Sequence, residues 1–145
     1  MAKILVMKNL APSIYEFVVD APLVAHKCQP GQFVMVRTDE YSERIPLTIA
    51  DFNRVEGTVT LIVQAVGNTT KHLCETFKEG DDILDIAGPL GQPSHMKNFG
   101  TVVVVGGGIG VALTGWLLEA SGYIENAAVQ SASCVSMLNF IYLWL

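Results

Sequence analysis

The chain has 145 residues, enough for one ordinary domain and too few for a second complete one. Half of the residues are hydrophobic and 16% are charged, which excludes a disordered chain and indicates a globular fold with a substantial core. The net charge is -5 and the nine Lys and Arg residues are scattered, so the sequence lacks the basic patch that binding to DNA or RNA requires.

Targeting segments and cysteine spacing favour a cytoplasmic protein. The apolar run in the N-terminal MAKILVMKNL is too short for a signal peptide. Polar residues interrupt the apolar C-terminal region before it reaches the roughly 20 residues of a membrane span. Cys28, Cys74 and Cys134 lie far apart with no CxxC pair, which predicts free thiols rather than a disulfide framework or a zinc site.

Residues 1–90 have the pattern of a β-rich domain. Runs of Val, Ile, Phe and Thr alternate with turn residues and predict strands at residues 4–9, 14–19, 33–37, 47–52, 58–65 and 82–87. Between the last two, TTKHLCETF at residues 69–77 predicts a short helix, because Leu73 and Phe77 share a face and Gly80 follows the end. Six strands with short turns favour an all-β, six-stranded antiparallel barrel without open edges.

The character of the sequence changes after Gly100. TVVVV is typical of a strand covered on both faces, and residues 111–120 have helical composition. Strand, glycine turn and helix make the first β-α unit of an α/β nucleotide-binding domain. The Gly-Pro-rich residues 88–100 connect the two regions, so we predict a barrel domain over residues 1–97 and an incomplete second domain over residues 98–145.

The glycine turn has two interpretations. Its backbone N–H groups suit a phosphate at a helix N-terminus, and the candidate residues are Gly106, Gly107, Gly108 and Gly110. The strict GxGxxG pattern fails at Val111, however. A turn that only packs strand against helix explains the motif equally well.

Five segments in this order resemble the ferredoxin-reductase superfamily, in which a flavin-binding barrel precedes a nicotinamide-binding domain. They are PGQFVMVR (30–37), ERIPLTIAD (43–51), VGNTTKHL (66–73), GPLGQPS (88–94) and VVVVGGGIGVA (102–112). Within the superfamily the chain looks most similar to electron-transfer subunits of the dihydroorotate dehydrogenase type. It is closest to the small subunits of sulfide dehydrogenase, or reduced-ferredoxin:NADP transhydrogenase, because PLTIAD replaces an RPIS-like sequence.

The resemblance implies an FAD site on the barrel. It places Pro46, Leu47 and Thr48 against the isoalloxazine, with the Thr48 hydroxyl toward flavin N5. It places the diphosphate at the helix N-terminus with Gly67, Thr69 and Thr70, where Thr69 could cap the helix and Thr70 face outward. Ile62, Val63 and Gln64 would lie beside the cofactor; core packing explains the first two equally well, so Gln64 is the informative residue.

Arg44 has two open interpretations. Its guanidinium suits a pyrophosphate. The Arg-x-Tyr-Ser pattern of the superfamily, with its last residue aligned to Thr48, places Ile45 at the arginine position. A solvated surface charge therefore explains Arg44 as well. The histidines His26, His72 and His95 have no partners at catalytic or metal-ligand spacing, and no chemistry is assigned to them.

The resemblance ends after Ala112. Family members continue through a full NAD(P) domain and a cysteine cluster for a [2Fe–2S] centre, whose ligands are absent here because Cys134 alone cannot hold it. These features predict a truncated or frameshifted form of a longer subunit.

The implied function is an electron-transfer flavoprotein subunit. Its FAD would pass electrons between a nicotinamide nucleotide and a larger flavin/iron–sulfur partner subunit, and no catalytic side chain or metal ligand is expected in this chain. The alternatives are an electron-transfer subunit of dihydroorotate dehydrogenase and a non-catalytic β-barrel interaction module.

Overall fold

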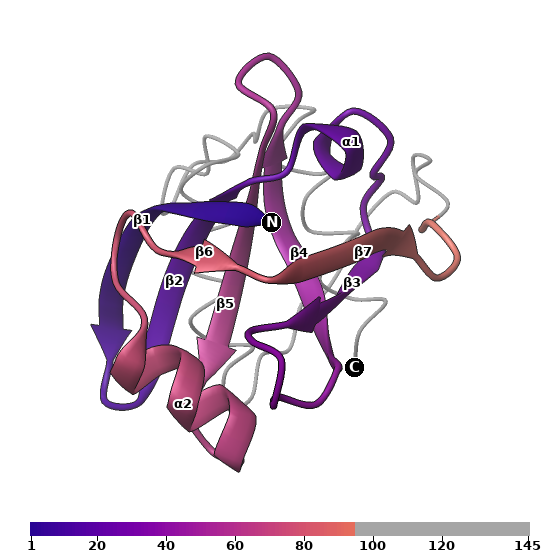
Figure 1. Cartoon of the computed structure of the whole chain (residues 1–145). Helices are drawn as coiled ribbons and strands as arrows, with labels where there is room; N and C mark the ends of the chain where they lie inside the picture. The colour runs from indigo at the N-terminus through magenta and orange to yellow at the C-terminus, as the bar shows by residue number, and fades with distance from the viewer. Residues whose placement is uncertain (95–145) are drawn as a thin grey trace, which may run out of the picture. The chain divides into compact units, whose positions relative to one another are not determined.

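The computed structural model describes residues 1–94, which form an antiparallel seven-stranded sheet curled into a nearly closed barrel (Figure 1). The strand order is β6-β1-β2-β5-β4-β3-β7. The elements are β1 (Ala2–Ala11), β2 (Ile14–Asp20), α1 (Pro22–Ala25), β3 (Phe33–Arg37), β4 (Ile45–Asn53), β5 (Thr58–Gln64), α2 (Asn68–Thr76), β6 (Asp82–Ile83) and β7 (Asp85–Leu90).

The core lies inside the barrel and follows from alternation along the strands. In β5, Val59, Leu61 and Val63 point inward and are almost fully buried. Phe17 of β2 lies opposite Leu61 in the antiparallel register and is buried as well. Because successive side chains of a strand point to opposite faces, one apolar set fills the barrel and the other faces outward. The predicted all-β antiparallel barrel is confirmed.

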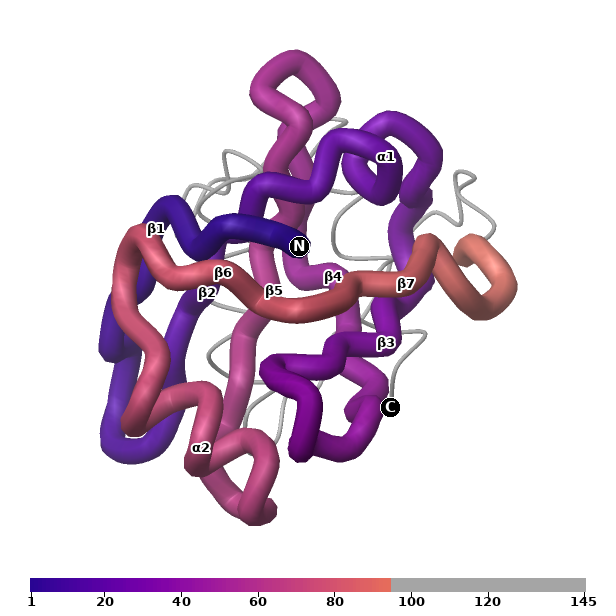
Figure 2. Tube along the Cα trace, viewed as in Figure 1, coloured from indigo at the N-terminus to yellow at the C-terminus, as the bar shows by residue number. Residues whose placement is uncertain are grey.

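The barrel closes through one chain segment, which the sequence predicts as a single strand at residues 82–87. The structure divides it into β6, which pairs with β1, and β7, which pairs with β3. At the junction the Leu84 N–H donates to the Thr38 carbonyl at 3.1 Å. The tube in Figure 2 follows this segment from one edge of the sheet to the other. The strand is interrupted because it changes partner, and the sheet has seven strands instead of six.

Two helices complete the described residues. The short helix α1 is absent from the sequence-based prediction, although Pro22 occupies its first turn, where proline is favoured. The predicted helix at residues 69–77 is α2, shifted by one residue. Its buried side chains, Leu73 and Cys74, belong to the core.

The barrel and its helices form one compact unit, Met1–Pro93. The predicted boundary at residues 97 and 98 lies outside the described residues, as do the predicted strand, glycine turn and helix of the second domain. That turn includes Gly106, Gly107, Gly108 and Gly110, so its role stays a prediction. Within residues 1–94, neither helix has the length and apolar character needed to cross a membrane.

Candidate functional site

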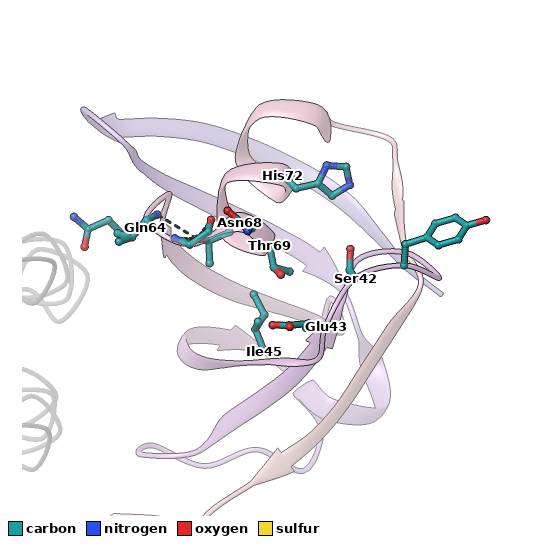
Figure 3. Close-up of a pocket in the computed structure, with 11 residues that line it drawn as sticks. Ser42, Glu43, Ile45, Gln64, Asn68, Thr69 and His72 are labelled. Carbon is teal, nitrogen blue, oxygen red and sulfur yellow. Dashed lines mark hydrogen bonds between the residues drawn. The ribbon is translucent and has the colours of Figure 1, made fainter.

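A pocket of about 580 Å³ opens between the N-terminal half of α2 and the loop that joins β3 to β4. Figure 3 shows Gln64 at one end, Asn68 and Thr69 in the middle, and His72 with Ser42 at the other end. The lining residues are Tyr41, Ser42, Glu43, Ile45, Gln64, Val66, Gly67, Asn68, Thr69, Thr70 and His72. The pocket therefore combines a strand end, a helix N-terminus and a surface loop.

The N-terminus of α2 is organised around Thr70. Gly67 is the N-cap, and its N–H donates to the Thr70 hydroxyl at 3.0 Å, while the Val66 N–H donates to the same oxygen at 3.2 Å. The hydroxyl donates in turn to the Gly67 carbonyl at 3.0 Å. The prediction that Thr69 caps the helix is wrong, because Gly67 is the N-cap and its N–H donates to Thr70, the third residue of the helix. Thr69 and Thr70 both line the pocket.

Backbone donors remain at this helix end. Helix geometry leaves the N–H groups of Asn68, Thr69 and Thr70 without acceptors one turn back. No acceptor for them is found within residues 1–94. These dipoles add to the partial positive charge at the N-terminus, which favours an anionic group. The pocket can therefore hold a phosphate or carboxylate at this point.

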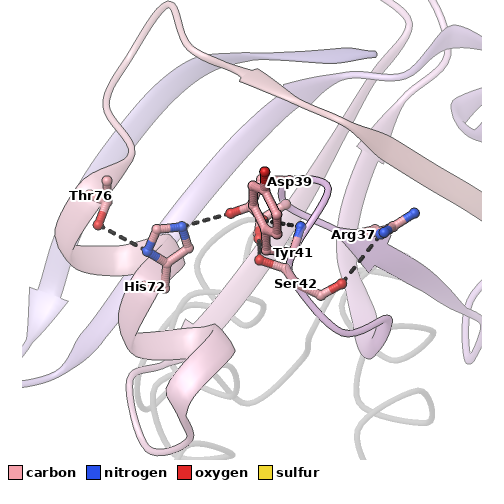
Figure 4. Close-up of polar contacts among 7 residues, drawn as sticks. Arg37, Asp39, Tyr41, Ser42, His72 and Thr76 are labelled. Atoms are coloured by element: carbon pink, nitrogen blue, oxygen red, sulfur yellow. Dashed lines mark hydrogen bonds and ion pairs between the residues drawn. The ribbon is translucent and has the colours of Figure 1, made fainter.

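The loop at residues 38–44 is held by its own side chains and by Arg37, the last residue of β3. The Arg37 guanidinium donates to two loop carbonyls, those of Ser42 at 3.3 Å and Glu40 at 2.5 Å. The Thr38 hydroxyl donates to the Ser42 hydroxyl at 2.6 Å. Asp39 accepts from the Tyr41 N–H at 2.8 Å. The loop thus presents one fixed wall to the pocket (Figure 4).

A side-chain contact joins this loop to α2. His72 Nε2 lies 2.8 Å from Asp39 Oδ2, and His72 Nδ1 lies 3.2 Å from the Thr76 hydroxyl. The Ser42 hydroxyl and the Tyr41 N–H, with a smaller contribution from His72, hold the pKa of Asp39 below its ordinary value. Asp39 is therefore an anion at neutral pH, and His72 is the donor. The sequence shows no partner for His72 at catalytic or metal-ligand spacing, and the partner that the structure brings to it lies 33 residues away.

The side chains around the pocket carry little positive charge. None of the lining residues from the described part of the chain is Lys or Arg, and Glu43 contributes a carboxylate. An anion here would depend on the α2 backbone. The lining residues that sequence reasoning missed are Tyr41, Ser42, Glu43, Ile45, Val66, Asn68 and His72. Helical spacing could have found His72, which lies three residues after Thr69 on the same side of α2.

The thiols and acidic residues offer no metal site within residues 1–94. Cys28 and Cys74 are buried and free, as predicted, whereas Cys134 lies outside the described residues. Burial raises the pKa of the Cys74 thiol to about 11, and the Glu75 carboxylate adds to this effect. Such a thiol stays protonated at neutral pH and is a poor nucleophile.

Known proteins are similar to this chain in both sequence and fold. No family model matches. The dihydroorotate dehydrogenase B (NAD(+)), electron transfer subunit homolog of Thermotoga maritima is 47% identical over 104 residues, which cover 72% of this chain and 36% of that protein. The dihydroorotate dehydrogenase B (NAD(+)), electron transfer subunit of Shouchella clausii is 40% identical over 109 residues, covering 71% and 41% of the two chains.

A solved structure of the NADH-dependent reduced ferredoxin-NADP oxidoreductase, described for flavin-based electron bifurcation, superimposes with a TM-score of 0.75 and 41% identity. The match covers 88% of this chain and 45% of that chain. The chain belongs to the ferredoxin-reductase-like family. An Amycolatopsis cytochrome P450 reductase shares the fold at 24% identity and a TM-score of 0.63, covering 77% of this chain and 35% of its own. The chain spans less than half the length of each of these relatives.

The remaining site predictions for this member of the ferredoxin-reductase-like family fall into three groups. Gln64, Gly67, Thr69 and Thr70 line the pocket together. Ile62 and Val63 are buried, and Val63 belongs to the barrel core. Pro46, Leu47 and Thr48 lie on β4 directly after the lining residue Ile45, and they do not line the pocket themselves.

Arg44 lies beside the pocket and forms an ion pair with Asp85. Its Nη1 lies 2.5 Å from Asp85 Oδ2, and both side chains are about half exposed. The residue before the strand therefore forms a surface ion pair in this structure. Both interpretations of Arg44, pyrophosphate ligand and surface charge, stay open.

Proposed function

We propose that this chain binds FAD and serves as the flavin-binding part of an electron-transfer oxidoreductase subunit. One observation carries the proposal: the N-terminus of α2 opens with free N–H groups into a pocket of about 580 Å³ on the outside of the barrel. A pocket of this size falls within the range of small-molecule and cofactor sites. The family relationship supports flavin as the cofactor class.

The residues present fit a dinucleotide. The N–H groups of Asn68, Thr69 and Thr70 would hold the diphosphate, and Gly67 leaves room for its close approach, since a Cβ at Gly67 would meet only the Thr70 hydroxyl at 3.8 Å. Gln64 lies at the strand end, where its amide can hydrogen-bond the flavin side of the ligand. Thr48 on the neighbouring strand β4 would face the isoalloxazine.

The cofactor supplies the redox chemistry, and the chain binds and orients it. The relatives' names point to NAD(+) and to ferredoxin-NADP chemistry in those proteins. By extension, we propose a nicotinamide nucleotide as one redox partner of this chain. A larger flavin/iron–sulfur subunit would be the other partner. This assembly belongs to the cytoplasm in our proposal.

Flavin content tests the proposal directly. We expect the purified chain to be yellow, or to become so on adding FAD, with FAD released at about one equivalent per chain on denaturation. The released flavin is identified by chromatography against FAD and FMN standards. A colourless chain that binds neither flavin, yet gives a β-type circular dichroism spectrum, contradicts the proposal and supports the non-catalytic interaction module.

A further inference from the structure

The contact between Asp39 and His72 ties the β3–β4 loop to α2 across the far end of the pocket (Figure 4). Each partner is held on its own element. Asp39 is fixed by the Tyr41 N–H, within a loop that Arg37 anchors. His72 is fixed by the Thr76 hydroxyl and by an edge-on contact with the Phe77 ring, whose centroid lies 5.6 Å away. The two walls of the pocket therefore have a preset separation.

This contact does not depend on the charge of the imidazole. Asp39 is ionised at neutral pH and can only accept, so Nε2 donates in both the neutral and the protonated ring. The Thr76 hydroxyl can donate to Nδ1 or accept from it. The tie between loop and helix is thus available throughout the neutral pH range.

The position of the contact along the pocket is informative. Figure 3 places His72 at the end opposite Gln64, with the N-terminus of α2 between them. His72 lies three residues beyond Thr69, and a helix rises about 1.5 Å per residue, so it is about 4.5 Å further along the axis. A flavin at the Gln64 end with its phosphate on α2 stops before this point. Only a ligand that continues past the phosphate reaches it.

We infer that Asp39 and His72 are positioning residues that select a flavin dinucleotide over the mononucleotide. This inference rests on the proposed function. The pair fixes the space in which the AMP half of FAD would lie, between the loop and α2, while FMN has no such half. A preformed space lowers the ordering cost of binding the longer ligand and leaves the shorter one unaffected.

The test compares FAD and FMN affinities of the full chain by fluorescence titration. For His72→Ala we expect FAD affinity to fall by about three- to tenfold, with FMN affinity unchanged. For Asp39→Ala we expect FAD affinity to fall by the same factor relative to FMN affinity, because the lost carboxylate strengthens the binding of both anionic flavins alike. Asp39 does not line the pocket, so a loss in Asp39→Ala reports on the tie itself. The double variant should be no weaker than either single variant, because the two residues act as a unit.

Two further variants serve as controls. Asp39→Asn keeps both contacts, since its oxygen accepts from Tyr41 and its amide donates to a neutral imidazole, and it should retain the FAD preference. Glu40→Ala removes a neighbouring loop carboxylate that makes no hydrogen bond or ion pair within residues 1–94, and the Glu40 carbonyl that accepts from Arg37 is kept. Loss of negative charge by itself strengthens the binding of both anionic flavins, so Glu40→Ala should show no loss for FAD.

An unchanged ratio of FAD to FMN affinity in Asp39→Ala overturns the inference, as does an equal loss for both flavins or additive losses in the double variant. Failure of the proposed function looks different. In that case the unmodified chain binds neither flavin.

Discussion

The helices α1 and α2 lie at opposite ends of the barrel, and the glycine beside each has a different environment (Figure 1). Gly57 is buried, has a φ of +73°, and a Cβ there would lie 2.9 Å from the Cβ of Pro22 at the start of α1. Gly67 is exposed, has a φ of −89°, and a Cβ there would meet only the Thr70 hydroxyl, at 3.8 Å. Packing against Pro22 therefore requires a glycine at position 57, whereas Gly67 borders open space.

The same contrast extends to the surrounding residues. Beside α1, Val24, Ala25 and Cys28 fill the barrel end, and Arg54 donates to the Cys28 carbonyl at 2.9 Å. Beside α2, only the side facing the barrel is buried, and the N-terminus opens into the pocket. Similar glycine-containing connections therefore serve stability at one end and, in our proposal, ligand binding at the other.

Substitution at the closed end should have the largest effect. We expect Gly57→Val to lower the free energy of unfolding by about 2–4 kcal/mol, because a left-handed backbone and a clash with Pro22 both oppose a branched side chain. Urea unfolding followed by circular dichroism measures the change. Gly80→Ala is the matched control: its φ is +93°, but nothing lies within 4 Å of the added Cβ, so it should cost only about 1 kcal/mol. If the two variants lose the same free energy of unfolding, the structure relieves the clash between the new side chain and Pro22.

At the open end the same substitution should act on binding. We expect Gly67→Val to change the free energy of unfolding by less than about 1 kcal/mol, because its backbone and surroundings tolerate a side chain. FAD affinity should fall by at least about tenfold, since the branched methyl groups occupy the approach to the α2 N–H groups. Gly67→Ala should retain most of the affinity. Normal FAD binding by Gly67→Val, measured by titration, would place the diphosphate elsewhere.

Sequence reasoning predicted what depends on local pattern. Alternating apolar residues identified the strands of the barrel, and the spacing of Leu73 and Phe77 identified α2. It missed the break at Leu84, because a strand that changes partner from β1 to β3 leaves no local signal. It assigned the cap to Thr69, whereas the N-cap is Gly67. An error of one residue at a helix start rotates each side chain by about 100°, so local pattern alone does not identify the capping residue.

The candidate site shows the same division. Gln64, Gly67, Thr69 and Thr70 are close in sequence and line one pocket. The opposite wall comes from four residues that only the closed barrel brings near α2: Tyr41, Ser42, Glu43 and Ile45. Asp39 and His72 meet across 33 residues, and neither lies in a motif that points to the other. Contacts made by tertiary structure were therefore beyond the reach of spacing arguments.

The smallest effect concerns Arg44, at the edge of the open end. Its ion pair with Asp85 is about half exposed, so Asp85→Asn should change the free energy of unfolding by no more than about 1 kcal/mol. If the freed guanidinium turns to the diphosphate, FAD affinity should rise, by up to about fivefold. We expect this rise in flavin titrations at low salt and its loss at high salt, because exposed charges are screened.

Removing a carboxylate near an anionic ligand raises affinity even without a new contact, so the decisive comparison is made in an Arg44→Ala background. There, Asp85→Asn should leave FAD affinity nearly unchanged if Arg44 acts as the ligand. A rise of the same size with and without Arg44 means that the charge of Asp85 acts from a distance. In that case Arg44 is a solvated surface charge, and the diphosphate is held by the backbone of α2 alone.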